Sequence, residues 1–421
     1  MNSDKKAAPV APGENRIIWG VAIAQLIGVG VLFHAFTLFI KPLNVEFGWT
    51  AFEVTSAFTL ALFVADVVAI PIGYLMDRRG GRIIMTAGAV IGAAALFATS
   101  RISNLTEFNL AFVGVGVAQS MLLGNIPASV IAANVRDYRR GLTYVAIIGG
   151  LSSAVAAPIV SVIIDAYGWR AGMVSLGAIL ICGPGLICAF ALRGTVGSRT
   201  AEFARRKLAI SEGRLPSAGQ GGTSPLRSAL RTRAFWALTV AFSVHWYVMS
   251  GVSVHLVPLL DERGLSTGLA VTIFALTGPA AVVGRVIMHV FDPMGSARRT
   301  GRLAFPIFAC GMLILIFAAA FGVTGHFIFA FVHGAAGGVI MIVRQTVIAE
   351  IFGLRGYAAI SGAMSTISIL PRTMSPVTLA LLRDNLGSYQ PVLWCLFGLI
   401  LLGTLAYFIG TADRRRPLAV S

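Results

Sequence analysis

Long apolar stretches, separated by short polar segments, recur along the whole chain. Most are close to the ~20 residues that a helix needs to cross the hydrocarbon core of a bilayer. Counting these runs predicts twelve membrane-spanning helices, over residues 17–40, 54–76, 83–100, 108–131, 142–164, 171–192, 235–260, 266–291, 303–323, 327–349, 357–382 and 391–411. The pattern therefore predicts an all-α, multi-pass membrane protein embedded in a lipid bilayer.

The composition excludes a water-soluble domain. Hydrophobic residues make up 57% of the chain and charged residues 12%, with a mean hydropathy of +0.83. A soluble domain carries about 25% charged residues. Residues 1–16 are polar, and the apolar run that starts at Ile17 is too long for a cleavable signal peptide.

The net charge of +16 suggests nucleic-acid binding, but the positions of the basic residues point to a membrane instead. If the N-terminus is cytoplasmic, the inside loops and tails hold 25 of the 33 Lys and Arg residues. The outside loops hold five and the helices three, as the positive-inside rule requires. We therefore expect both termini in the cytoplasm, a location in the cell membrane of a bacterium (the inner membrane), and no nucleic-acid partner.

The longest polar interruption, residues 193–233, divides the predicted helices into two sets of six. It is basic and rich in Ser, Gly and Pro, which is typical of a cytoplasmic linker. We predict an N-terminal tail (1–16), a first six-helix bundle (17–192), this linker, a second bundle (234–411) and a C-terminal tail (412–421). Because six helices return the chain to its starting side, the two halves are parallel repeats.

A sequence motif supports this division, because it recurs 215 positions later in degraded form. The first copy runs from Gly73 to Arg82 and the second from His289 to Arg299. The pairs in register are Asp77 with Asp292, Gly80 with Gly295, and Arg140-Gly141 with Arg355-Gly356. Two related halves are a common design of secondary transporters.

Glycine and proline are frequent inside the predicted helices. Small residues let membrane helices approach closely, and proline is tolerated there. We expect tight or kinked packing at Gly149-Gly150 to Pro158, and at Gly278-Pro279 with Gly284.

The first copy of the motif resembles the signature of the major facilitator superfamily in the loop between its second and third helices. The matching residues are Gly73, Asp77, Arg78, Gly80 and Arg82. The resemblance implies two six-helix bundles around a central cavity, which rock to expose it alternately to each side without ATP hydrolysis. It also implies that Asp77, Arg78 and Arg82 form a cytoplasmic charge network that latches one conformation.

Four further strings are similar to those of the monocarboxylate and oxalate–formate transporters, a branch of this superfamily. They are residues 46–49, 139–142, 165–170 and 350–353. We find no phosphate-binding loop, nucleophile–base arrangement or metal-ligand spacing, so we expect neither an enzyme nor a bound cofactor or metal. The four cysteines all fall inside predicted helices and are expected to be small packing residues.

Four charged residues lie well inside predicted helices: Asp66, Arg285, Arg344 and Arg372. Such a charge costs about 2.5–3.5 kcal/mol even on the most lenient insertion scale, so it needs a partner, water or a ligand. Three arginines against one aspartate leave an excess of two positive charges. This excess favours an anionic substrate.

Arg285 is the first candidate for contact with a substrate carboxylate. Monocarboxylate transporters carry an arginine at the similar position, often with an aspartate four residues earlier, where this chain has Ala281. A guanidinium group can donate two parallel hydrogen bonds to a carboxylate. Alternatively, Arg285 pairs with Asp66 or with helix carbonyls. The oxalate–formate branch has a basic residue in the helix that holds Arg372, which contacts the substrate or satisfies a carbonyl freed by Pro371.

The remaining candidates have two interpretations each. Asp66 is either a proton carrier or the salt-bridge partner of Arg285. Arg344 is two turns from Glu350, so it reaches the membrane interface or joins the cytoplasmic latch, together with Asp292 from the second copy of the motif.

Histidines and aromatic residues complete the predicted site. His34 and the run His245-Trp246-Tyr247 lie in helices that line the cavity in this superfamily. Histidine titrates in the physiological range, and the aromatic pair suits a planar ligand. The alternative for each histidine is the usual one for a neutral histidine in a membrane helix, a hydrogen-bonded packing residue.

These observations predict a secondary active transporter of a small organic anion, a mono- or dicarboxylate, coupled to protons or to a counter-anion. The alternative keeps the fold and changes the ligand to a planar aromatic compound, a vitamin such as riboflavin, or a drug exported against protons. A membrane sensor is disfavoured because the chain has no soluble output domain beyond the linker.

Overall fold

The computed structural model describes residues 13–123, 125–135, 138–195, 225–291, 296–353 and 357–412, and these residues form helices without a strand. In the first half, the helices are α1 (Glu14–Leu32), η1 (His34–Leu38), α2 (Ile40–Phe47), α3 (Ala51–Arg79), α4 (Gly81–Thr99), α5 (Leu105–Leu122), α6 (Asn125–Asn134), α7 (Tyr138–Gly150), α8 (Ser152–Leu180), η2 (Ile181–Gly185) and α9 (Leu186–Ala191). In the second half they are α11 (Pro225–Leu230), α12 (Arg233–Glu262), α13 (Thr267–Phe291), α14 (Ala297–Phe317), η3 (Ala318–Phe321), α15 (Gly322–Phe352), α16 (Tyr357–Leu386) and α17 (Tyr389–Ala412).

These helices form twelve membrane crossings, and each of the twelve predicted runs coincides with one of them. Within the described residues, nine stretches are long and apolar enough to span a membrane. Two of the nine, Arg140–Ala191 and Ala297–Phe352, each hold two crossings. The first bends at Gly168, whose backbone is not helical, and the second at η3. Helix α16 is not among the nine because it is rich in Ser and Thr, yet it packs against α3, α12 and α17 as a full-length helix.

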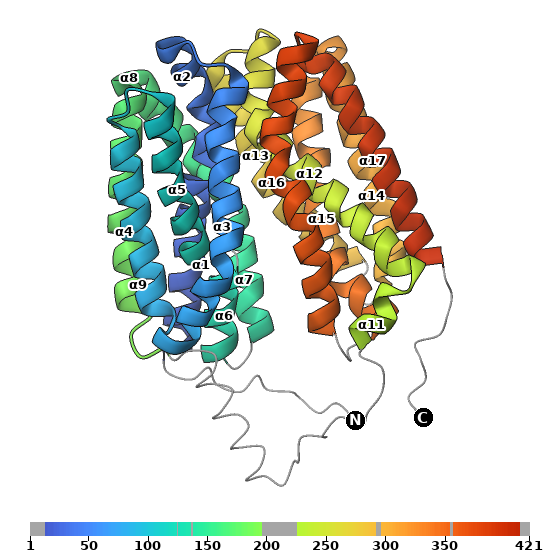
Figure 1. Cartoon of the computed structure of the whole chain (residues 1–421). Coiled ribbons are helices and arrows are strands. Elements are labelled where there is room, and N and C mark those ends of the chain that lie inside the picture. The colour runs from blue at the N-terminus through green and yellow to red at the C-terminus, as the bar shows by residue number, and fades with distance from the viewer. Residues whose placement is uncertain are drawn as a thin grey trace.

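The crossings form two bundles that stand side by side, α1 to α9 in one and α12 to α17 in the other (Figure 1). Helices α13 and α15 pack closely through glycine, as the sequence predicted for Gly284. A Cβ atom on Gly284 would lie 2.7 Å from Ala335 Cα, and one on Gly338 2.8 Å from Ala281 Cα. Such backbone approach is how membrane helices gain contact area in lipid, where no hydrophobic force drives them together.

Glycine also shapes the loops that carry the family strings. Gly48, Gly80, Gly168 and Gly353 have φ values of 67°, 78°, 80° and 77°. At Gly80, Gly168 and Gly353 ψ lies between 162° and 174°, a region that is essentially restricted to glycine. Gly80 and Gly168 each reverse the chain between two crossings without a longer loop, and Gly353 follows the last residue of α15.

Two glycines of the motif between Gly73 and Arg82 have different structural roles, and alanine substitution should distinguish them. Gly80→Ala is expected to lower stability by about 1–3 kcal/mol, because it forces a Cβ into that restricted region. Gly73→Ala should have little effect, because its backbone is helical and a Cβ would meet nothing within 4 Å. Thermal denaturation of the two variants in detergent tests this. Equal melting temperatures would contradict the assigned role of Gly80.

Glu46 joins two of the family strings. Its carboxylate accepts a hydrogen bond from Trp169 Nε1 at 2.5 Å and forms an ion pair with Arg170. These two hydrogen bonds, the Trp169 bond first, hold the pKa of Glu46 below its ordinary value of 4.5. The stabilisation is therefore present above about pH 4.5 and disappears as the pH falls through the lowered pKa.

Comparison with Glu46→Gln should show this pH dependence. We expect wild-type protein to melt at a higher temperature than the variant at neutral pH, and the difference to shrink as the pH falls below about 4.5. The measurement is a melting curve at each pH in one detergent. A difference that grows on acidification would contradict the sign of the lowered pKa.

One group of polar contacts between the two bundles lies at one end of the molecule. We call the end where α1 begins and α17 ends the termini end, and the opposite end the far end. At the far end, Lys41 forms an ion pair with Asp261 at 2.9 Å. The Asp384 carboxylate accepts a hydrogen bond from the Phe52 amide at 3.2 Å, and Thr37 Oγ1 donates to the Val254 carbonyl at 2.7 Å. These contacts hold the far ends of the bundles together.

Candidate functional site

The central polar contact of the molecule is an ion pair between the two bundles. Arg372 Nη2 on α16 lies 2.5 Å from Asp66 Oδ1 on α3, and Thr373 Oγ1 donates to Asp66 Oδ2 at 3.0 Å. The Asp66 side chain is 16% exposed and that of Arg372 35%. The pairing of Asp66 with Arg285, one of the two expectations for this residue, is therefore wrong for this conformation.

Arg285 lies deeper toward the termini end, where its guanidinium group also reaches both bundles. Nη1 donates to the Ala146 carbonyl on α7 at 3.0 Å, and Nε to the Gly338 carbonyl on α15 at 3.4 Å. Nη2 lies 3.5 Å from Met341 Sδ. Of the partners considered from the sequence, the structure shows Arg285 donating hydrogen bonds to helix carbonyl oxygens. All of its partners among the described residues are neutral.

Arg344 on α15 contacts the neighbouring helix α16. Its guanidinium group donates to Ser365 Oγ, and its Nε is buried without a partner among the described residues. Glu350 has other partners: it accepts from Ser296 Oγ at 2.7 Å and lies 3.4 Å from Arg298 Nε. Arg344 and Glu350 therefore contact different helices, and their part in the cytoplasmic latch stays a prediction.

The four intramembrane charges thus fall into two groups. Asp66 and Arg372 neutralise each other. Arg285 and Arg344 contact only neutral groups among the described residues. Since an unpaired charge is costly inside a membrane, these two cations are the groups that an anionic ligand would neutralise.

The aromatic candidates lie at different places around the ion pair. The Arg372 guanidinium carbon is 6.0 Å from the centre of the Trp246 ring, at the limit of a cation–π contact. Tyr247 OH forms a hydrogen bond with Thr378 Oγ1 at 2.7 Å, which ties α12 to α16. Within the predicted run, Trp246 therefore lies beside a charged candidate, Arg372.

The two histidine candidates pack against phenylalanine rings. His245 is buried, with its ring centre 5.0 Å from that of Phe308, and its Nδ1 has no partner among the described residues. His34 lies edge-on to Phe274 of the other bundle, with 5.5 Å between ring centres. His34 therefore contributes to the interface between the bundles.

The predicted latch is described only in part. The Asp77 side chain and Asp292 lie outside the described residues. Arg78 contacts Tyr74, with its guanidinium carbon 4.3 Å from the ring centre, and Arg82 Nε donates to the Ala189 carbonyl at 2.9 Å. The latch role of these residues stays a prediction.

Sequence reasoning missed Thr373, which shares the Asp66 carboxylate with Arg372. Its hydroxyl is fully buried, and many Ser and Thr residues of α16 donate to their own helix instead. The carbonyls of Ala146 and Gly338 could not be found either, because every residue carries a carbonyl. Only adjacency to Arg372 in the sequence could have drawn attention to Thr373.

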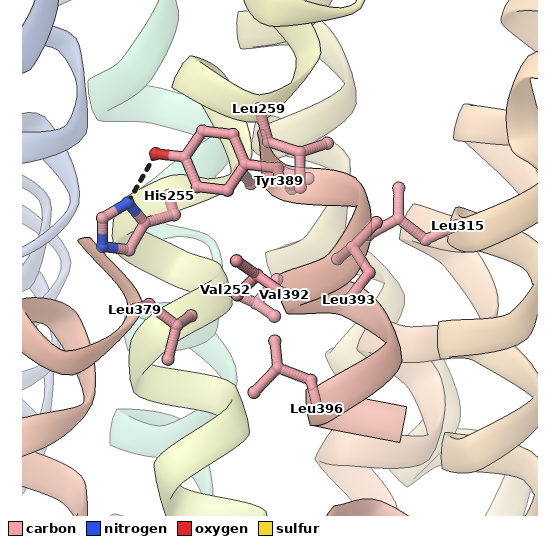
Figure 2. Close-up of a pocket in the computed structure, with 10 residues that line it drawn as sticks. Val252, His255, Leu259, Leu315, Leu379, Tyr389, Val392, Leu393 and Leu396 are labelled. Atoms are coloured by element: carbon pink, nitrogen blue, oxygen red, sulfur yellow. Dashed lines mark hydrogen bonds between the residues drawn. The ribbon is translucent and has the colours of Figure 1, made fainter. Parts of the chain in front are cut away.

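A small pocket inside the second bundle is not the place for an anion. It lies between α12, α14, α16 and α17 and is lined mainly by aliphatic side chains, with His255 and Tyr389 at one edge (Figure 2). His255 Nε2 donates to the Pro376 carbonyl at 2.7 Å, so its Nδ1 accepts from Tyr389 OH at 2.8 Å. No charged side chain lines this pocket, which makes it a packing void.

The fold and the interfacial charges define a membrane transporter built from two six-helix bundles. Residues 18–376 match the profile of the Major Facilitator Superfamily, and the chain belongs to this family. It is a transporter rather than an enzyme.

Its relatives are distant. Mouse monocarboxylate transporter 1 is 22% identical over 95% of this chain and 86% of its own length. A probable L-galactonate transporter of Escherichia coli K12 is 22% identical over 56% of this chain and 53% of its own length. The crystal structure of a bacterial homologue of the human lysosomal transporter Spinster, inward-facing and unoccupied, matches with a TM-score of 0.68. It covers 96% of this chain and 98% of its own, at 16% identity, which shows the fold alone.

Proposed function

We propose that this protein is a secondary active transporter of a small organic anion, a mono- or dicarboxylate, that works by proton symport or anion exchange. The observation that carries the proposal is the position of Arg285. Its guanidinium group reaches both bundles and contacts only neutral groups among the described residues. A carboxylate between the bundles would replace weak carbonyl contacts with charge-assisted hydrogen bonds.

The relatives support this substrate class. The two relatives, a monocarboxylate transporter and a probable L-galactonate transporter, are both named for carboxylates. We further propose that both termini are cytoplasmic, as the basic loops indicate. The far-end contacts then close the outside, and this conformation faces the cytoplasm. We also propose the domain limits that the sequence predicts, and the role of the cytoplasmic charge network as a latch.

The experiment is a thermal-shift screen of the purified protein, because a ligand that binds the folded state stabilises it by RT ln(1 + [L]/Kd). The panel contains lactate, succinate, L-galactonate, riboflavin and a cationic dye. Stabilisation by one or more of the three carboxylates supports the proposal. Stabilisation by the dye alone would overturn it.

A second candidate, a planar aromatic ligand, is favoured by one contact. The Trp246 ring lies beside the Arg372 guanidinium group, so an aromatic compound could stack there. In the same screen, this candidate predicts a shift with riboflavin that Trp246→Leu removes. A shift with the aliphatic carboxylates that survives Trp246→Leu favours the organic-anion proposal.

A further inference from the structure

The short helix α11 and the start of α12 carry an exposed basic surface at the termini end of the second bundle (Figure 1). We propose that this surface binds the headgroup of an anionic phospholipid, such as phosphatidylglycerol. The surface, which we call the α11 patch, consists of Arg227, Leu230, Arg231, Arg233 and Trp236, all of them exposed. The proposal concerns the membrane around the protein, so it does not depend on which solute is transported.

The opposite face of α11 fixes this helix to the second bundle. Ala229 is 3% exposed, and Leu226 packs against the hydrophobic core. Thr232 Oγ1 donates to the Ala229 carbonyl at 2.7 Å, and the same side chain caps the first turn of α12. Because residues four apart lie on one face of a helical turn, Arg227 and Arg231 share the exposed side. The patch is therefore held in place before any lipid binds.

The patch lies at the level of the membrane–water interface. Trp236, in the first turn of α12, is 51% exposed, and its Nε1 donates to the Leu230 carbonyl at 2.9 Å. Tryptophan is enriched at this level because its ring is apolar and its N–H group is polar. Arg233 begins α12, three residues before Trp236 on the side of the termini end. The arginines of the patch are therefore at the depth of lipid headgroups.

Charge makes an anionic headgroup the fitting occupant. The guanidinium groups of Arg227, Arg231 and Arg233 have no hydrogen-bond or ion-pair partner among the described residues. Arg302, at the same end, instead donates to a hydroxyl and a carbonyl at the end of α17. The preceding linker, residues 196–224, holds five basic and two acidic residues, so it brings no excess of negative charge. A phosphate group accepts the paired hydrogen bonds that a guanidinium group donates.

A lipid on the α11 patch would also act on the interface between the bundles. Helix α11 packs against α16 as well as α12. Helix α16 carries Arg372, which pairs with Asp66 of the first bundle. A ligand that binds the folded state stabilises it, so a headgroup held by α11 should strengthen the attachment of α16 and raise the melting temperature.

The test measures the binding of phosphatidylglycerol and of phosphatidylcholine to the purified full-length protein in detergent, by native mass spectrometry. Wild-type protein is expected to bind phosphatidylglycerol at least about tenfold more tightly and to melt at a higher temperature with it. Combining Arg227→Gln, Arg231→Gln and Arg233→Gln should lower that affinity at least about tenfold, since each arginine near an anionic surface contributes about fivefold. Binding of phosphatidylcholine, which has no net charge, should not change.

The matched control replaces Arg414, Arg415 and Arg416 near the C-terminus with glutamine, which changes the net charge equally. It should bind phosphatidylglycerol as wild type does. Equal losses in the two triple variants would show attraction by net charge alone and overturn the patch. A wild-type protein without preference for phosphatidylglycerol, or an α11 variant with unchanged affinity, would overturn it too.

Two further measurements complete the test. Displacement of the lipid by inorganic phosphate, but not by chloride at equal ionic strength, would identify a soluble anion as the occupant and contradict the proposal. If the triple variant of the α11 patch does not fold, Arg227→Gln alone should still lower the affinity for phosphatidylglycerol about fivefold. No loss in that single variant would then overturn the proposal.

Discussion

Replacing Arg285 with glutamine is expected to weaken carboxylate binding at least about thirtyfold and to reduce uptake to background. Truncating one partner of a buried, hydrogen-bonded charge pair costs about 2–5 kcal/mol, and every 1.4 kcal/mol is tenfold in affinity. Glutamine keeps a donor for the Ala146 or Gly338 carbonyl but removes the charge. Folding should survive, because no carboxylate among the described residues loses its partner when the guanidinium group is removed.

Two further variants give this experiment its controls. Arg101→Gln removes a charge from an exposed position between α4 and α5 and should leave uptake unchanged. Arg285→Lys keeps the charge but loses the planar fork, so binding should be intermediate. The measurements are uptake of a radiolabelled carboxylate into proteoliposomes and the melting temperature of each variant. If Arg285→Gln takes up the carboxylate as wild type does, Arg285 is not the residue that binds the substrate carboxylate.

The second large effect is expected from Gly278→Val, which should drive the bundles apart at the far end and stop transport. A Cβ on Gly278 would lie 2.5 Å from Ser153 Oγ of the other bundle and would also collide with the Gly150 carbonyl oxygen. Real Cβ contacts are essentially never closer than 3.0 Å. The serine can rotate, but the Gly150 carbonyl is backbone, so α13 must move away from the junction of α7 and α8.

This separation can be measured directly. Spin labels on Val45→Cys and Asn385→Cys, both exposed at the far end, report the distance between the bundles. The four native cysteines are replaced by serine or alanine beforehand. We expect Gly278→Val to lengthen the main distance and to lower uptake at least about tenfold, because this conformation is lost from the cycle. Gly268→Val is the matched control, since its Cβ would meet nothing within 4 Å. An unchanged distance with normal uptake would contradict the role of the Gly278 contact.

The twelve crossings could be predicted from the sequence because the signal for each is local. A bilayer requires about twenty apolar residues in a run, and such a run is visible without knowledge of its neighbours. The position of Gly168 in a string of the family likewise marked the turn that splits α8. The ends of the helices could be predicted less exactly. The predicted run 54–76 lies within α3 (Ala51–Arg79), whose last turn is polar and extends beyond the apolar segment.

The candidate site was predicted as a set of residues but not as a set of pairs. Asp66, Arg285, Arg344 and Arg372 could be selected because a charge in an apolar run is costly wherever it lies. Their partners depend on which helices meet. Asp66 and Arg372 are 306 residues apart, and nothing local indicates that α3 packs against α16. Glu350 could be selected as a member of the latch, but nothing local indicates that its partner is Arg298 at the start of α14.

The sequence by itself determined the class of the molecule: a bilayer protein of two related six-helix halves with an intramembrane excess of positive charge. These properties follow from the composition and the apolar run length of each segment, which can be read without knowing which other segments it contacts. Only the tertiary structure decided that Asp66 neutralises Arg372, that Thr373 shares the carboxylate, and that Arg285 and Arg344 contact neutral groups alone. Those outcomes depend on side-chain positions to within an ångström, which the packing of distant helices sets, because charge pairing weakens steeply with distance and desolvation penalises every charge left over.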